Sequence, residues 1–212
     1  MAFEKIPSGY PGVDEVFDYI RMGDNVVWQV SALGEYRLFA EAFAKQALKD
    51  GRNLIYMHYA RHESMFSPQP GLKVFEFDPM LGFEPFTVDI YNRITEEGEG
   101  AFYIFDCLSE LQVAWHTDQM MGNFFRVTCP YLHELDTVAY FPIMRGRHSF
   151  ETTASIRDTT QVLVDVYTSD SAVYIHTLKA LDRDSMNIYL PHVSRSGGPF
   201  LPLDGGVALS RY

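Results

Sequence analysis

The chain has 212 residues, of which 47% are hydrophobic, 15% aromatic and 21% charged, and this is enough apolar material for the core of one domain. The 17 basic and 28 acidic residues leave a net charge of −11. Because a surplus of negative charge repels a phosphate backbone, the composition argues against a nucleic acid as the partner.

Composition also bears on the compartment. No apolar run reaches the roughly 20 residues that span a bilayer, and the N-terminus lacks a basic region followed by an apolar one. The two cysteines, Cys107 and Cys129, lie among apolar residues, which predicts buried thiols and no disulfide scaffold. We therefore expect a cytoplasmic protein with no signal peptide and no membrane partner.

Five short apolar runs predict the strands of the domain. They show no alternation of polar and apolar residues, as is typical of strands buried on both faces of a parallel sheet. In chain order they are Asn25–Val30, Asn53–Tyr59, Lys73–Phe77, Ala101–Asp106 and Thr137–Pro142.

Helical patterns separate these runs. Leu38–Leu48 has an apolar stripe and stops at an Asp-Gly pair, and Phe86–Glu97 stops at a glycine. A third pattern covers Asp118–Leu135, where Pro130 is expected to break or kink the helix. Strands that alternate with helices predict an α/β domain with a mainly parallel sheet.

The last third of the chain differs in character. Residues Gln161–Ala180 read as two strands around a tight turn, which predicts an antiparallel hairpin at a sheet edge. After Pro191 the chain is rich in glycine and proline, so we expect residues 191–212 to form a tail or linker.

Two segments carry a resemblance to a known family. "AFYIFDCLSEL" (Ala101–Leu111) is similar to a Walker B strand that ends in aspartate, here Asp106. The segment near the N-terminus matches an I-P-[ST]-G-x-P-G-[LV]-D pattern through Ile6, Pro7, Ser8, Gly9, Pro11, Gly12 and Asp14. Together they resemble the KaiC/RecA-like ATPase family over roughly Lys5 to Leu190.

This resemblance implies a fold and a mode of assembly. The fold is a RecA-like three-layer α/β sandwich, the P-loop NTPase fold, with a mainly parallel central sheet, helices on both faces and a C-terminal antiparallel hairpin. It implies one domain over residues 1–190. Since RecA-like domains associate side by side, it also implies a homo-oligomer or attachment to further domains of a longer protein.

The Walker A loop of this family is degenerate in the present chain. A phosphate-binding loop needs G-x-x-x-x-G-K-[ST], because glycines let backbone N–H groups surround the phosphates, the lysine reaches their oxygens and the hydroxyl holds Mg²⁺. In register, Ser31 and Tyr36 replace the glycines, Arg37 replaces the lysine and Leu38 replaces the hydroxyl residue. Only the additional glycine of the family, Gly34, is retained.

The family's catalytic glutamate pair is also missing. Ala60 and Arg61 stand at those positions, so the resemblance implies no base for hydrolysis and no catalytic residue. We expect a non-catalytic domain with a regulatory, scaffolding or self-assembly role. Alternatives are a sensor that binds ATP or ADP weakly without Mg²⁺, and an active ATPase with a rearranged site. The vestigial nucleotide site would comprise Gly34, Arg37 and Asp106.

Other polar clusters have simpler interpretations. His58, His62 and Glu63 lie at a strand end, where a four-residue spacing does not suit a metal, and no metal ligand is expected. Arg145, Arg147 and His148 are the only candidate basic cluster, and they are expected in a solvated loop. Finally, "MNIYLPHVSRSGGPFLPL" (residues 186–203) resembles a segment that precedes the catalytic part of some phosphoenolpyruvate synthase-like proteins, which implies an N-terminal accessory domain.

Overall fold

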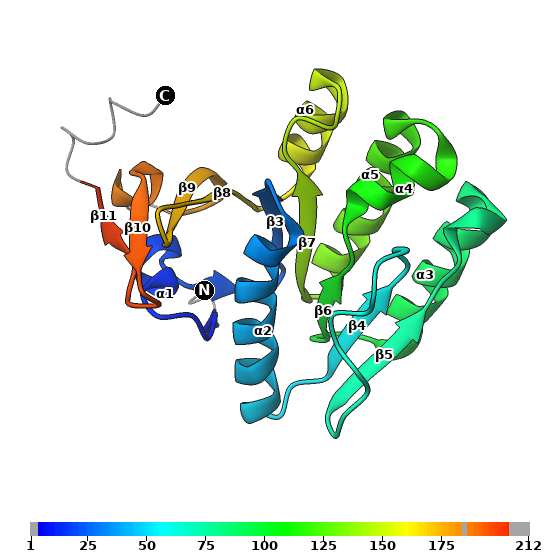
Figure 1. Ribbon diagram of the computed structural model, residues 1–212. Helices are drawn as coiled ribbons and strands as arrows, with labels where there is room; N and C mark the ends of the chain where they lie inside the picture. Colours follow the sequence, from blue (N-terminus) through cyan, green and yellow to red (C-terminus); the bar gives the residue numbers. More distant parts are fainter. Residues whose placement is uncertain (1–3, 184–185, 204–212) are drawn as a thin grey trace.

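The computed structural model describes residues 4–183 and 186–203, and its centre is a nine-stranded sheet (Figure 1). The spatial order of the strands is β11-β10-β9-β8-β3-β7-β6-β4-β5. Their bounds are β3 Asn25–Val30, β4 Leu54–His58, β5 Leu72–Glu76, β6 Phe102–Phe105, β7 Val138–Met144, β8 Val162–Ser169, β9 Ala172–Ala180, β10 His192–Arg195 and β11 Leu201–Pro202. A separate antiparallel pair joins β1 (Lys5–Ile6) to β2 (Ile20–Arg21).

Six neighbouring strands, from β8 to β5, are parallel, and the remaining three add in antiparallel fashion. The five predicted strands all form, and each is paired in parallel with its neighbours among them. The predicted hairpin is confirmed as β8 and β9. Continuous apolar runs thus indicated the parallel region correctly, because both of its faces are covered.

Helices cover the two faces of the sheet (Figure 1). One face carries α1 (Val13–Phe17) and α2 (Leu33–Lys49). The other carries α3 (Phe83–Glu97), α4 (Leu108–Trp115), α5 (Asp118–Glu134) and α6 (Phe150–Thr159). Two short 3₁₀ turns, η1 (Pro79–Leu81) and η2 (Met186–Tyr189), complete the elements. The expected three-layer α/β sandwich is confirmed.

Each face of the sheet has its own hydrophobic core. Alternate residues of β3 separate between the cores, since Trp28 packs with α2 and Val27 packs with the helices opposite. The ring of Trp28 stacks on Phe39 of α2 with 4.2 Å between centroids, and Phe43 stacks on Tyr140 at the same distance. The apolar stripe of α2 is therefore what fixes this helix on the sheet.

Among the described residues, no helix is both long and apolar enough to cross a membrane.

Several predicted boundaries are wrong. Helix α2 begins at Leu33 instead of Leu38, and α3 begins at Phe83 instead of Phe86. Pro130 does not end α5, which continues to Glu134. Proline costs one backbone hydrogen bond, but buried side chains on both sides of it, including Cys129 and Leu132, hold the helix against the sheet.

The expected tail from residue 191 includes two strands. β10 pairs with β9 and β11 pairs with β10, so the described part of this segment extends the sheet. Phe200 is buried, and its ring lies 6.1 Å from that of Phe39 and 5.4 Å from that of Tyr10. Glycine and proline mark turns here, and they did not reveal the pairing around them. Residues 204–212 lie outside the described part of the chain.

The glycine-rich motif near the N-terminus is a packing device. Gly9 has φ +78° and lies so close to α2 that an added Cβ would overlap the carbonyl oxygen of Ala42. The Asp14 carboxylate accepts the N–H of Ser8 at 2.7 Å, which closes the segment on itself. The motif therefore serves to seat the N-terminal segment on the domain.

Candidate functional site

The turn between β3 and α2 is short. β3 ends at Val30 and α2 begins at Leu33, so only Ser31 and Ala32 lie between them. Gly34 is exposed in the first turn of the helix, and an added Cβ there would meet no atom within 4 Å. The positions that align with the Walker A lysine and hydroxyl are helical, because the helix starts before them.

The start of α2 is occupied by the chain's own carboxylate. Oε2 of Glu35 accepts the backbone N–H groups of Ser31 at 2.7 Å and Ala32 at 3.2 Å. Its other oxygen accepts the hydroxyl of Thr168 on β8 at 3.0 Å, and the residue is only 6% exposed. A helix N-terminus favours a negative charge, and Glu35 supplies it internally.

The side chains of the next two residues, Tyr36 and Arg37, lie in different surroundings: the first is buried and the second is exposed. Tyr36 is fully buried, and its hydroxyl donates to the carbonyl oxygens of Phe105 and Tyr140 at 3.2 and 3.3 Å. Burial raises the pKa of Tyr36 well above its ordinary value. Arg37 is exposed and forms a 2.5 Å ion pair with Glu41 one turn further along the helix, which raises its pKa. The tyrosine is a core residue and the arginine a surface residue.

Asp106 lies just after β6, fully buried, and four donors surround its carboxylate. The hydroxyl of Tyr56 donates to Oδ1. Oδ2 contacts Nδ1 of His58 at 2.5 Å and accepts the backbone N–H groups of Tyr59 at 2.9 Å and Ala60 at 3.0 Å. The side chain therefore ties the end of β6 to the end of β4. Burial and the nearby Asp106 charge raise the pKa of Tyr56 far above its ordinary range.

The histidines of the β4 end differ in their contacts. His58 is held by Asp106, whereas Nε2 of His62 lies 3.7 Å from Oδ1 of the same carboxylate and is buried with no hydrogen bond in the described part of the chain. In that same part, no group of three or more histidine, cysteine or acidic side chains could hold a metal ion.

The basic loop after β7 forms hydrogen bonds with β8 and with the turn before α2. Arg145 donates to Oδ1 of Asp165 at 2.6 Å and to the Ser31 hydroxyl at 2.7 Å, so it links β7, β8 and the turn before α2. Nearby, Nε2 of His148 lies 2.6 Å from the hydroxyl of Ser109. The loop is exposed at Gly146 and Arg147, as the sequence predicted, while Arg145 and His148 each form hydrogen bonds with neighbouring elements.

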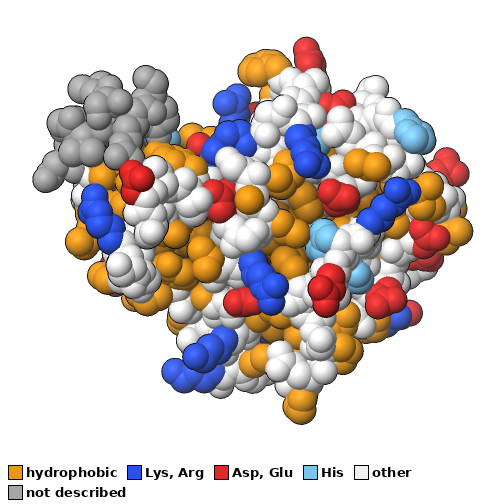
Figure 2. All heavy atoms as spheres, in the orientation of Figure 1, with side chains coloured by type: hydrophobic (Ala, Val, Ile, Leu, Met, Phe, Trp, Pro, Cys, Tyr) orange, Lys and Arg blue, Asp and Glu red, His pale blue; other side chains and the backbone are white. Residues whose placement is uncertain are grey.

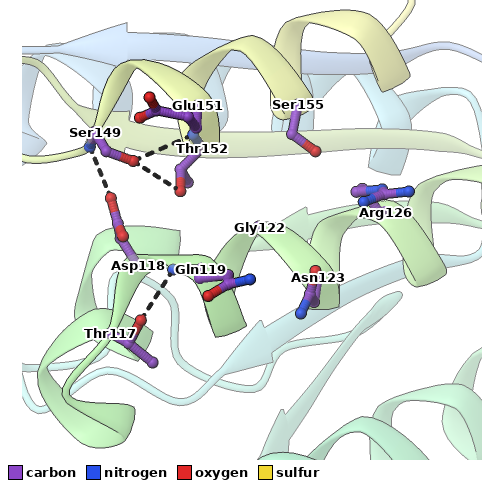
Figure 3. Close-up of a pocket in the computed structure, with 10 residues that line it drawn as sticks. All are labelled: Thr117, Asp118, Gln119, Gly122, Asn123, Arg126, Ser149, Glu151, Thr152 and Ser155. Atoms are coloured by element: carbon purple, nitrogen blue, oxygen red, sulfur yellow. Dashed lines mark hydrogen bonds between the residues drawn. The ribbon is translucent and has the colours of Figure 1, made fainter.

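A polar groove lies on the helical layer, between α5 and α6 (Figure 3). Its volume is about 460 Å³. Figure 3 shows Asp118 pointing at the start of α6, where its carboxylate accepts the N–H of Ser149 at 2.7 Å. This contact lowers the pKa of Asp118. None of the predicted site residues lines this groove.

The three residues of the predicted site lie on two elements, and no described hydrogen bond or ion pair joins Asp106 to the other two. Gly34 and Arg37 lie on the first turns of α2. Sequence reasoning missed Glu35, although an acidic residue in the first turn of a helix is a recognisable signal. It also missed the pairing of Asp106 with His58, for which local sequence gives no signal.

Comparison with known proteins bears on the fold. No protein-family model matches the chain, and no curated protein matches it. Among solved structures it is similar to a KaiC-like protein from the hyperthermophilic archaeon Pyrococcus horikoshii OT3, with a TM-score of 0.71 over 96% of this chain and 100% of the other. The chain has a KaiC/RecA-like fold.

The likeness extends no further than the fold, because the two sequences are only 12% identical. The degenerate Walker A loop and the relation to phosphoenolpyruvate synthase-like proteins stay predictions.

Proposed function

We propose that this chain is a non-catalytic KaiC/RecA-like domain with a regulatory, scaffolding or self-assembly role. The observation that supports it most is the Glu35 carboxylate, which accepts the backbone N–H groups of Ser31 and Ala32. A nucleotide phosphate at this helix end needs such groups as donors, and the carboxylate would repel it. Phosphate binding here would require an internal contact to break first.

Two further features support the proposal. Both oxygens of Asp106 already have donors from the protein, so a Mg²⁺ ion would have to displace them to use this carboxylate. Ala60 and Arg61, which align with the catalytic glutamates, carry no base. Hydrolysis of ATP would lack its phosphate cradle, its metal ligand and its water-activating group together.

The main alternative is a nucleotide sensor that uses Arg37 without Mg²⁺. This side chain is exposed, and its ion pair with Glu41 is a surface pair that contributes little. A phosphate could compete with Glu41 for it. An active ATPase with a rearranged site would need a base and a metal ligand from elsewhere in the chain.

Nucleotide titration distinguishes these functions. We expect isothermal calorimetry with ATP and ADP, with and without Mg²⁺, to give no binding heat, and phosphate release to stay at the enzyme-free background. Glu35→Gln removes the charge at the start of α2 and should bind ATP more tightly than wild type. Glu84→Gln, which changes the first turn of α3, is the matched control and should not.

Two results would contradict the proposal in different ways. Mg²⁺-dependent phosphate release that co-elutes with the protein and stops on chelation would establish an ATPase. Binding without Mg²⁺ that Arg37→Ala abolishes would establish the sensor instead.

We propose that the partner of this domain is a second copy of the same chain. RecA-like domains generally associate through their flanks, and such a surface does not depend on the catalytic residues. Light scattering at micromolar concentration should then show a dimer or larger species. A monomer across this range would exclude self-assembly by this chain alone and leave a regulatory or scaffolding role within a longer protein.

A further inference from the structure

A cavity of about 410 Å³ is lined by residues of α1, β10 and β11 and of the turns beside them. Figure 1 shows these elements together on one side of the molecule, and Figure 2 shows hydrophobic side chains gathered at the surface of that side. The N–H of Phe200 donates to the carbonyl of Pro11 at 3.4 Å, which joins the segment before β11 to the segment before α1. No residue from the start of α2 lines this cavity, so it is separate from the site considered above.

The walls of the cavity are mainly apolar. Val16 and Phe200 line it from the hydrophobic core that α2 covers. Pro199, Leu201 and Pro202 line it from exposed positions. A hydrocarbon group that covers such a surface removes apolar area from water, which favours a ligand with an apolar body.

One buried polar side chain interrupts these walls. His192 on β10 lines the cavity and is only 4% exposed. Its Nδ1 lies 2.7 Å from the carbonyl oxygen of Leu190, which can only accept, so Nδ1 carries the hydrogen. Within the described residues no hydrogen bond reaches the other ring nitrogen, Nε2, and protein atoms do not enclose it. Nε2 is therefore the polar atom that this histidine offers to a ligand.

The surroundings favour the neutral form of His192. Burial lowers its pKa, and the hydrogen bond to Leu190 opposes this shift only in part. In a neutral imidazole with its hydrogen on Nδ1, Nε2 is a hydrogen-bond acceptor. Among the described residues that line the cavity, only Glu15 is charged, and its side chain is exposed. A carboxylate beside the cavity disfavours an anionic ligand.

We propose that this cavity binds a small, uncharged aromatic molecule that carries a hydroxyl group. The hydroxyl donates to Nε2 of His192, and the ring of the ligand packs on Phe200 and the apolar side chains around it. A ligand of the same shape without the hydroxyl leaves the buried acceptor unsatisfied. An anionic ligand is repelled by Glu15. This site goes beyond the proposed function, because it uses none of the residues at the start of α2.

Titrations followed by NMR test this on the full ¹⁵N-labelled chain at about pH 8, where a phenol with a pKa of about 10 keeps its proton. The probes are phenol, toluene, which has a similar shape without the donor, and sodium benzoate. We expect saturable shifts of the backbone amides of Val16 and Leu201 with phenol, about tenfold weaker binding of toluene and no binding of benzoate. The ¹⁵N signal of Nε2 in His192 should move with the same midpoint when phenol is added.

A pair of histidine variants tests the hydrogen bond. His192→Asn keeps an N–H that can donate to the carbonyl of Leu190 and removes Nε2, so phenol and toluene should then bind equally well. His133 also contacts a backbone carbonyl through Nδ1, that of Gly23 at 2.9 Å, and it does not line the cavity. His133→Asn is the matched control and should keep the preference for phenol.

A second pair of variants does not alter a buried residue. Leu201 is 61% exposed, so Leu201→Ser should leave the fold intact. It removes part of the apolar wall and should weaken phenol binding about fivefold. Leu178→Ser changes an exposed leucine of β9 that does not line the cavity, and it should leave phenol binding unchanged.

Four outcomes would overturn the proposal. The first is no saturable shift with phenol, and the second is equal binding of phenol and toluene by the wild-type chain. The third is a preference for phenol that persists in a folded His192→Asn variant. The fourth is an equal effect of the two leucine variants.

Discussion

Asp106 ends a segment that resembles a Walker B strand, and four donors from the protein surround its carboxylate. Its buried carboxylate accepts from Tyr56, His58 and two backbone N–H groups that belong to a neighbouring strand end. A buried carboxylate with this many donors costs little in the folded state, because each donor replaces a water molecule. Its removal leaves those donors without a partner.

We therefore predict that Asp106→Ala lowers the free energy of unfolding by about 3–5 kcal/mol. Urea denaturation followed by circular dichroism measures this. Asp89→Ala on the exposed side of α3 is the control, and it should stay within about 0.5 kcal/mol of wild type. A stable Asp106→Ala protein would mean that this carboxylate does not hold the two strand ends together.

At the scale of elements, the N-terminal segment depends on one glycine. Gly9 has a positive φ, and an added Cβ would overlap the carbonyl oxygen of Ala42 on α2. We predict that Gly9→Ala lowers the free energy of unfolding by about 2 kcal/mol or more, since backbone strain and a steric clash add. Chemical denaturation gives the value.

Gly51 provides a matched comparison for this prediction. It also has a positive φ, of +66°, but an added Cβ there would meet no atom within 4 Å. Gly51→Ala should therefore show only the cost of the left-handed conformation, about 1–2 kcal/mol. Equal losses in the two variants would show that backbone conformation alone, and not the contact with α2, makes glycine necessary at position 9.

At the scale of the whole molecule, the buried aromatic and thiol groups predict a response to alkaline pH. Burial raises the pKa of Tyr36, Tyr59, Tyr140 and Cys129 well above their ordinary values, and that of Cys107 to about 11. In the unfolded chain cysteine titrates near about 8.5 and tyrosine near about 10. The unfolded state thus loses protons that the folded state keeps.

The sign of the effect follows from this difference. Where the unfolded state binds fewer protons, the free energy of unfolding falls as pH rises. Stability should begin to fall above about pH 8.5 and fall more steeply above about pH 10. Urea midpoints measured across this range test it. A stability that does not change up to about pH 11 would contradict the burial of these groups.

The sequence by itself determined the layers of this protein. A continuous apolar run such as Asn25–Val30 has apolar side chains on both faces of its strand. Both faces must be covered, which is typical of a parallel sheet between two layers of helices. The stripe through Phe39 and Phe43 marked the face that α2 buries. The hairpin was likewise readable, because its turn lies between two runs of strand-forming residues.

Tertiary structure decided the rest. The start of α2 depends on Glu35, whose carboxylate is fixed partly by Thr168 on a distant strand. Asp106 and His58 are 48 residues apart, and only the pairing of β4 with β6 brings them together. Residues 191–212 read as a tail because they are rich in glycine and proline, whereas residues 192–195 form a strand that pairs with the edge of β9. Local patterns report which faces are apolar, whereas a site is made by partners that only the folded chain places side by side.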